Sequence, residues 1–133
     1  MKNLLIVFLF TPIIIFSNNN PLFEIETRLR IVNEKTLYVI VQIDNKSGRR
    51  ISQLSGFLTQ STYNGNIISE KKIIHINSKG PILIEDQTSI RGLTFPFDKN
   101  LDHRFKYNIN KIVFQNDYRE FIWTEKEGLI RIN

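Results

Sequence analysis

Residues 23–45 read FEIETRLRIVNEKTLYVIVQIDN, and apolar and polar side chains alternate along most of this stretch. Successive side chains of a β-strand point to opposite faces, so this alternation predicts two strands that each bury one face. The first strand is expected to point Phe23, Ile25, Thr27, Leu29 and Ile31 inward. The second is expected to bury Leu37, Val39, Val41 and Ile43. Residues 33–35 then form a short hairpin loop.

The same pattern continues to the end of the chain. Further strands are predicted over residues 51–62, 67–76, 82–85, 89–95, 104–114, 118–124 and 129–132. Residues 44–48, DNKSG, are typical of a turn, and Asn64-Gly65 is a strong hairpin signal because both residues tolerate positive φ. No segment of helical length shows a period of 3.6 residues.

Seven to nine short strands without helices predict an all-β fold, an antiparallel sandwich of the immunoglobulin or fibronectin kind. A closed barrel needs a similar number of strands and stays open as an alternative.

The N-terminus carries the features of an export signal. Lys2 gives a positive start, residues 4–16 form an apolar run, and Ser17 is a small residue at a plausible cleavage point. We therefore expect a signal peptide over residues 1–17 and a single mature domain over residues 18–133. The apolar run is shorter than the roughly 20 residues that span a bilayer. An uncleaved segment acting as a membrane anchor is the alternative.

Composition restricts the partners. The chain has 18 Lys and Arg against 13 Asp and Glu, so removing Lys2 leaves a net charge of +4. The basic doublets 49–50 and 71–72 are scattered, and there is no basic stripe with interleaved aromatic residues, so we expect no nucleic-acid partner. There is no cysteine, so stability must come from apolar burial and backbone pairing. The abundance of Asn, Ile and Lys suggests a bacterial source.

Three motifs carry a family resemblance. Residues 39–48 (VIVQIDNKSG), 63–68 (YNGNII) and 112–117 (IVFQND), the last followed by Trp123, form strand and turn patterns. Over residues 37–123 the chain resembles the FxLYD-type and related extracytoplasmic immunoglobulin-like domains of bacteria. This resemblance implies an accessory or adhesive module and no shared catalytic residue.

The polar residues give little sign of catalysis or metal binding. Asp98, Asp102 and His103 have ligand chemistry, but their spacing fits no calcium loop, and we interpret them as a solvated loop. His75 lies between two isoleucines and is expected on the solvent face of its strand. Residues 52–56 lack the strand–turn–helix context of a nucleophile elbow. We therefore expect no enzyme activity, no metal and no cofactor.

Aromatic residues near the C-terminus are the best candidates for a contact surface. Tyr107, Tyr118, Phe121 and Trp123 fall in the last two long strands, and most are expected in the core. If Trp123 packs inward, Phe121 shares its face and Tyr118 points outward. The possible partner-binding residues are therefore Tyr118, Arg119 and Tyr107.

These observations favour a periplasmic or secreted, non-enzymatic domain that binds another protein of the bacterial envelope. Two alternatives remain open: a binder of an anionic envelope polymer or lipid surface through its basic residues, and a hydrolase with an unrecognised site. The sequence does not indicate an oligomeric state.

Overall fold

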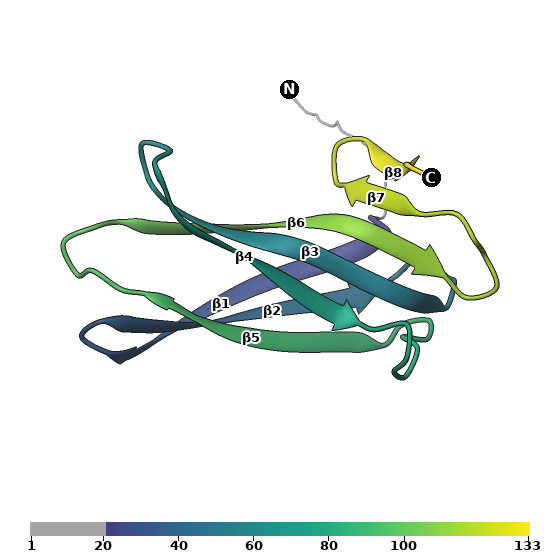
Figure 1. The fold of residues 1–133 in the computed structure, drawn as a ribbon, viewed down its shortest axis with the longest axis horizontal. Coiled ribbons are helices and arrows are strands. Elements are labelled where there is room, and N and C mark those ends of the chain that lie inside the picture. The colour runs from purple at the N-terminus through teal and green to yellow at the C-terminus, as the bar shows by residue number, and fades with distance from the viewer. Residues whose placement is uncertain (1–20) are drawn as a thin grey trace, which may run out of the picture.

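The structure is a computed structural model that describes residues 21–133, and it consists of two antiparallel sheets packed face to face (Figure 1). The first sheet has the strand order β1 (Phe23–Asn33), β2 (Thr36–Asn45) and β5 (Thr88–Pro96). The second has the order β4 (Ile67–Ile76), β3 (Ile51–Thr62), β6 (His103–Phe114), β7 (Phe121–Thr124) and β8 (Gly128–Arg131). The predicted all-β antiparallel sandwich is thus confirmed, with eight strands.

The predicted signal segment, residues 1–17, lies outside the described residues. Within residues 21–133, no helix is long and apolar enough to cross a membrane.

The chain crosses between the two layers. It leaves the first sheet after β2, builds β3 and β4 in the second, returns for β5, and goes back for β6. β4 pairs with β3 and not with β5, whereas the constant-type immunoglobulin order places the fourth strand beside the fifth. β4 and β5 are consequently edge strands of different sheets.

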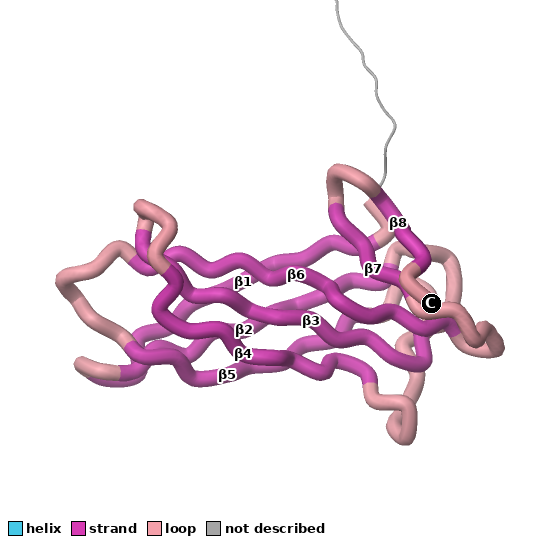
Figure 2. Tube along the Cα trace, turned by 45° about the horizontal axis from the view of Figure 1, so that its top comes forward, coloured by secondary structure: helices cyan, strands magenta, loops and turns pink. Residues whose placement is uncertain are grey.

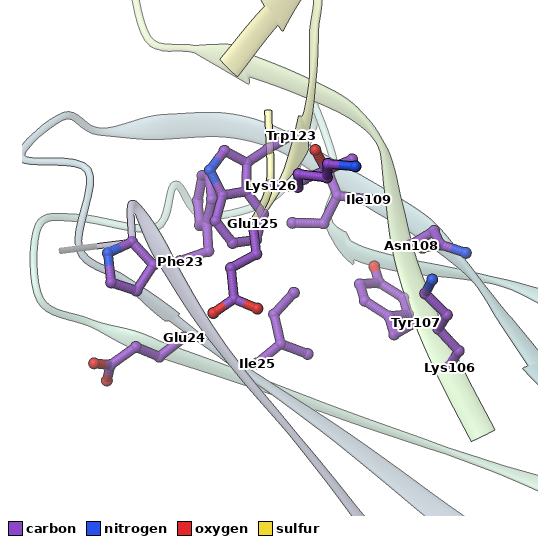
Figure 3. Close-up of a pocket in the computed structure, with 12 residues that line it drawn as sticks. Phe23, Glu24, Ile25, Lys106, Tyr107, Asn108, Ile109, Trp123, Glu125 and Lys126 are labelled. Carbon is purple, nitrogen blue, oxygen red and sulfur yellow. The ribbon is translucent and has the colours of Figure 1, made fainter. Parts of the chain in front are cut away.

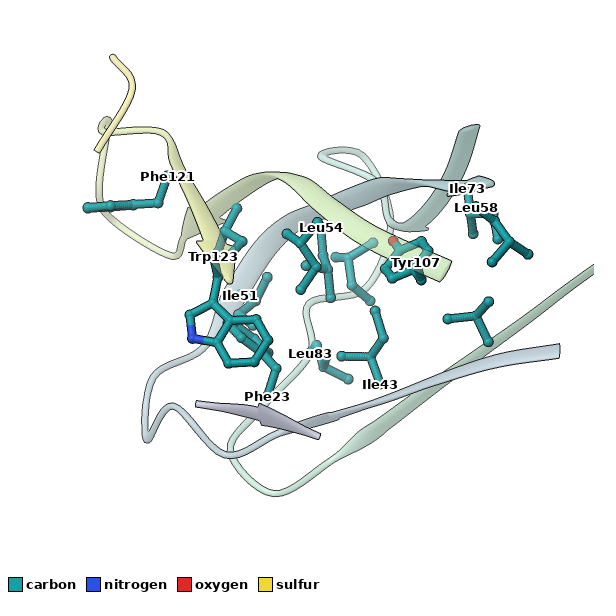
Figure 4. Close-up of a cluster of buried hydrophobic side chains, with 14 of the residues drawn as sticks. Phe23, Ile43, Ile51, Leu54, Leu58, Ile73, Leu83, Tyr107, Phe121 and Trp123 are labelled. Carbon is teal, nitrogen blue, oxygen red and sulfur yellow. The ribbon is translucent and has the colours of Figure 1, made fainter. Parts of the chain in front are cut away.

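The core lies between the sheets and is built as the alternation predicts. Val39, Val41 and Ile43 of β2 have no exposed surface, and Leu37 is also buried. Facing them are Leu54 and Leu58 of β3 and the aromatic residues of β6 and β7 (Figure 4). At one end of the core the rings of Phe23 and Trp123 meet edge to face, with centroids 5.4 Å apart.

The prediction for β1 is only partly correct. Phe23 is buried, but Leu29 and Ile31, which share its face, are 50% and 60% exposed. The reason is the short β7: its Trp123 covers Phe23 at the start of β1, and the 11-residue β1 continues far beyond the four residues of β7. The apolar face of β1 is therefore uncovered over its second half.

Two other predicted strands are shorter than expected. The strand expected over residues 118–124 begins only at Phe121, because residues 118–120 follow a turn at Asn116, where φ is 63°. The strand expected over residues 82–85 is reduced to one bridge between Leu83 and Ile51. The remaining strands lie within two residues of their predicted bounds.

Candidate interaction site

The three predicted contact residues lie in different environments. Tyr118 is 99% exposed and Arg119 is exposed, whereas Phe121 and Trp123 are buried as expected. Tyr107 lies apart from Tyr118 and Arg119: it is only 8% exposed, its ring lies between the sheets, and burial raises the pKa of its hydroxyl. The structure therefore brings Tyr118 and Arg119 together in a loop and separates Tyr107 from them.

An ion-pair network fixes the loop that carries Tyr118. Arg119 Nη2 lies 2.7 Å from Asp117 Oδ2, and Arg49 Nη2 lies 3.0 Å from the same oxygen. Hydrogen bonds from the side chain and backbone of Arg119, followed by that from Arg49, hold the pKa of Asp117 well below its usual range. The arginines are thus tied to one carboxylate, and Tyr118 projects from an ordered loop.

His75 was wrongly predicted to face solvent. It is 1% exposed, and its Nδ1 hydrogen-bonds Ser89 Oγ at 2.9 Å. The reason is that His75 shares the inward face of β4 with Ile73, while Ile74 is 50% exposed. A β-bulge, in which Leu54 pairs with Ile76 and Ser55 with Ile74, then brings Ile76 to the inward face as well. Burial, followed by the charge of Arg91, lowers the pKa of His75 to about 4.

The histidine cluster is closed to substrates. Ser89 is itself buried, and the Tyr107 ring lies 5.7 Å from the His75 ring. The His75 Nε2 atom and the Tyr107 hydroxyl have no hydrogen-bond partner among residues 21–133. A serine beside a histidine can act as a nucleophile only where a substrate reaches it, so this arrangement is part of the core.

The polar loop before β6 is held by local hydrogen bonds. Gln60 Nε2 lies 3.1 Å from His103 Nδ1, and His103 Nε2 lies 3.0 Å from the backbone oxygen of Asp98. Asp102 pairs with Arg104. In the described part of the chain, no three His, Asp or Glu side chains come together in a group that could hold a metal ion.

The two lateral sides of the sandwich differ. On the β4–β5 side, side chains join the sheets: Lys71 Nζ donates to the carbonyl oxygen of Thr94 at 2.7 Å, and Arg91 Nη2 donates to that of His75 at 3.0 Å. On the opposite side β1 faces β6, and within residues 21–133 no hydrogen bond or ion pair joins these two strands. This second side is called the open side below.

A hollow of about 680 Å³ lies at one end of the open side (Figure 3). Apolar side chains from three strands form its floor, and charged side chains stand at its rim. The floor residues are Phe23, Ile25, Tyr107, Ile109 and Trp123. The rim residues are Glu24, Lys106, Glu125 and Lys126. An apolar floor with a charged rim is the usual composition of a binding site.

A second hollow, of about 660 Å³, lies at the other end of β1, where Ile31 faces the loop between β5 and β6. The inward row of β1, from Ile25 through Leu29 to Ile31, runs between the two hollows. Six residues of strand span about 20 Å. Thr27 is the one polar side chain of this row, so the open side is an elongated, mostly apolar strip and not an isolated pit.

The sequence contained one signal for this site. Leu29 and Ile31 were recognised as apolar residues on one face of a strand, but alternation alone does not tell whether a second layer covers that face. The cover depends on the length of β7, more than 90 residues away in the chain.

Comparisons with known proteins support the fold alone. Searches against protein-family models and curated proteins find no match to this chain. A solved structure titled "X-ray structure of Northeast Structural Genomics Consortium target SoR45" is similar over 84% of this chain and 80% of its own, with a TM-score of 0.53 and 13% identity. At this identity the similarity concerns the arrangement of strands.

Proposed function

We propose that this protein is an exported, non-enzymatic domain that binds another protein of the bacterial envelope through its open side. The observation that carries the proposal is the uncovered apolar row on β1, where Leu29 and Ile31 are 50% and 60% exposed on the face that buries Phe23. Contiguous exposed apolar surface in a folded domain commonly marks a protein contact. The resemblance to FxLYD-type domains and the predicted signal peptide supply the envelope location in this proposal.

The polar clusters do not favour a catalytic alternative. His75 and Ser89 are enclosed, and His103 is engaged by Gln60 and Asp98. The open side, by contrast, combines Phe23, Ile25 and Trp123 with charged side chains of both signs. Such a surface suits recognition of an apolar segment more than acid–base chemistry.

Site-directed photocrosslinking tests this function. A photoreactive phenylalanine analogue at position 29 samples the open side, and the same analogue at position 90 is the control, because Ile90 is 49% exposed on the outer face of β5. In the native cells we expect a discrete covalent adduct with a second protein at position 29 and none at position 90.

The captured protein is then identified, purified and titrated against the exported domain. Leu29→Asp should weaken binding at least tenfold, while Ile90→Asp should leave it unchanged. Equal adducts at both positions, or no adduct at position 29, would overturn the proposal. Salt-sensitive retention on isolated envelopes without an adduct would instead favour an anionic polymer as the ligand.

A further inference from the structure

We propose that the open side binds one extended segment of the partner protein, which adds to the second sheet as a strand beside residues 103–108 of β6. This inference rests on the proposed function, because it specifies how the same site recognises its partner. It also defines the chemistry of the segment, which is apolar at alternate positions and acidic at the positions between them.

The first argument is the unpaired edge of β6. Residues 103–108 pair with β3 on one side, from Thr62 opposite His103 to Phe57 opposite Asn108. On the other side β7 first pairs at Ile109 and continues to Ile112, and Figure 2 shows β7 and β8 gathered at that end of β6. Within the described residues, no strand pairs with this edge over residues 103–108. Backbone N–H and C=O groups along such an edge are matched best by another extended chain.

The second argument is the apolar row beneath this edge. A strand that continued the line of β7 would lie over β1, as Trp123 already lies over Phe23. Its inward side chains would meet Ile25, Leu29 and Ile31, which are half-buried or exposed in the free domain. Since alternate residues of a strand share a face, the segment must be apolar at every second position. About six residues match the length of the unpaired edge.

The third argument is the charge on the outer face of β6. Arg104, Lys106 and Asn108 alternate with the inward residues and are exposed. Arg104 pairs with Asp102, whereas Lys106 has no acidic partner within 4.0 Å among the described residues. Outward residues of an added strand would lie directly beside these groups, and opposite charges in such cross-strand positions are stabilising. Acidic residues therefore fit the outward positions.

Synthetic peptides test this mode of binding. The probe is a fluorescein-labelled octapeptide of alternating valine and glutamate, and its anisotropy is followed during titration with the exported, purified protein. One control peptide has the same composition with the valines and glutamates in separate blocks. A second replaces each glutamate with lysine. The alternating Val–Glu peptide should bind at least tenfold more tightly than either control.

Matched variants locate the peptide on the structure. Leu29→Asp should weaken peptide binding at least tenfold, and Ile90→Asp should not change it, although the two parent residues are similarly exposed. Lys106→Glu should reverse the preference between the glutamate and lysine peptides. Lys72→Glu is its control, because Lys72 is also exposed but lies on β4. If Leu29→Asp does not fold, Ile31→Asp replaces it.

Backbone pairing has its own readout. In amide hydrogen exchange, binding of the Val–Glu peptide should increase protection within residues 103–108. Equal affinity for the alternating and blocked peptides, or unchanged exchange on binding, would overturn strand addition. A dimer of the protein that Leu29→Asp dissociates would also overturn it by assigning the open side to a second copy.

The two proposals fail separately. A partner captured at position 29, combined with peptides that do not bind, would leave the proposed function standing and reject strand addition. Peptide binding without any captured partner would support the chemistry of the open side and reject the proposed envelope function.

Discussion

Acid should destabilise this protein through His75, and the size of the effect follows from its burial. The unfolded chain binds a proton at His75 near the ordinary pKa of 6.5, whereas the folded protein binds it only near a pKa of about 4. Between these values the unfolded state carries more protons, so stability is fully present above the unfolded pKa and is lost as the pH falls towards the folded pKa. A difference of about 2.5 pKa units corresponds to up to about 3 kcal/mol.

Urea unfolding at about pH 7 and about pH 4.5 measures this loss in the wild-type protein and in His75→Gln. The variant has its own stability at neutral pH, so the quantity compared is the change in the free energy of unfolding between the two pH values. Comparing the two changes removes contributions that the two proteins share. We expect the wild type to lose about 2 kcal/mol more than the variant over this interval.

This loss is a large share of the total stability of a domain of this size, which is only about 5–15 kcal/mol. An NMR titration of the His75 ring gives an independent check. If the folded protein shows a His75 pKa near 6.5, or if His75→Gln retains the wild-type pH dependence, the argument from burial is wrong.

Three further predictions concern the core, the glycines and the exposed loop. Val41→Asp should unfold the domain, because Val41 is fully buried. Ile40→Asp, on the opposite face of β2, should lower the melting temperature much less. An equal decrease in melting temperature for both variants would contradict the sandwich as described. Gly56→Ala should lower the free energy of unfolding in urea by about 1–3 kcal/mol, because a Cβ there collides with the carbonyl oxygen of Asn108. Gly92→Ala should lower it less, because a Cβ there meets only the movable end of the Tyr38 side chain. Tyr118→Ala should leave the melting temperature unchanged because the ring is 99% exposed. If Tyr118 is a contact residue, the same change should weaken envelope pull-down, and unchanged retention would remove it from the contact surface.

The alternation of apolar and polar residues predicted the central strands well, because one face of each strand lies against the core and the other lies nearer to solvent. Along β2, Val39, Val41 and Ile43 alternate with half-buried neighbours. The DNKSG turn was also predictable, since Asn45 provides its own local hydrogen bonds. Its Nδ2 donates to the carbonyl oxygen of Arg49 at 2.8 Å, and its Oδ1 accepts from the backbone of Ser47 at 3.1 Å.

Prediction failed where the environment of a residue depends on distant chain segments. In β4, Ile73 and His75 face the core by alternation and Ile74 faces outward, and a bulge then brings Ile76 to the core face as well. Nothing in the local sequence Ile74-His75-Ile76 distinguishes the bulged arrangement from a regular strand. The burial of Tyr107 was not predictable for a related reason, because an aromatic residue with a polar tip is found both at interfaces and in cores.

The open side was predictable from the sequence in one respect and not in another. Sequence patterning correctly aligned Leu29 and Ile31 with Phe23, but the layer that would cover them is absent beyond Trp123 in the described residues. On the outward face of the same strand, Glu24, Glu26, Arg28 and Arg30 alternate with this row, and charged side chains on an edge strand discourage indiscriminate pairing. The free edge of β6 also carries outward charges, Arg104 and Lys106, but these are of one sign and favour an acidic partner strand, whereas the outward charges of β1 are of both signs. That difference is why we place recognition of a partner strand between β1 and β6 and not along the outer edge of β1.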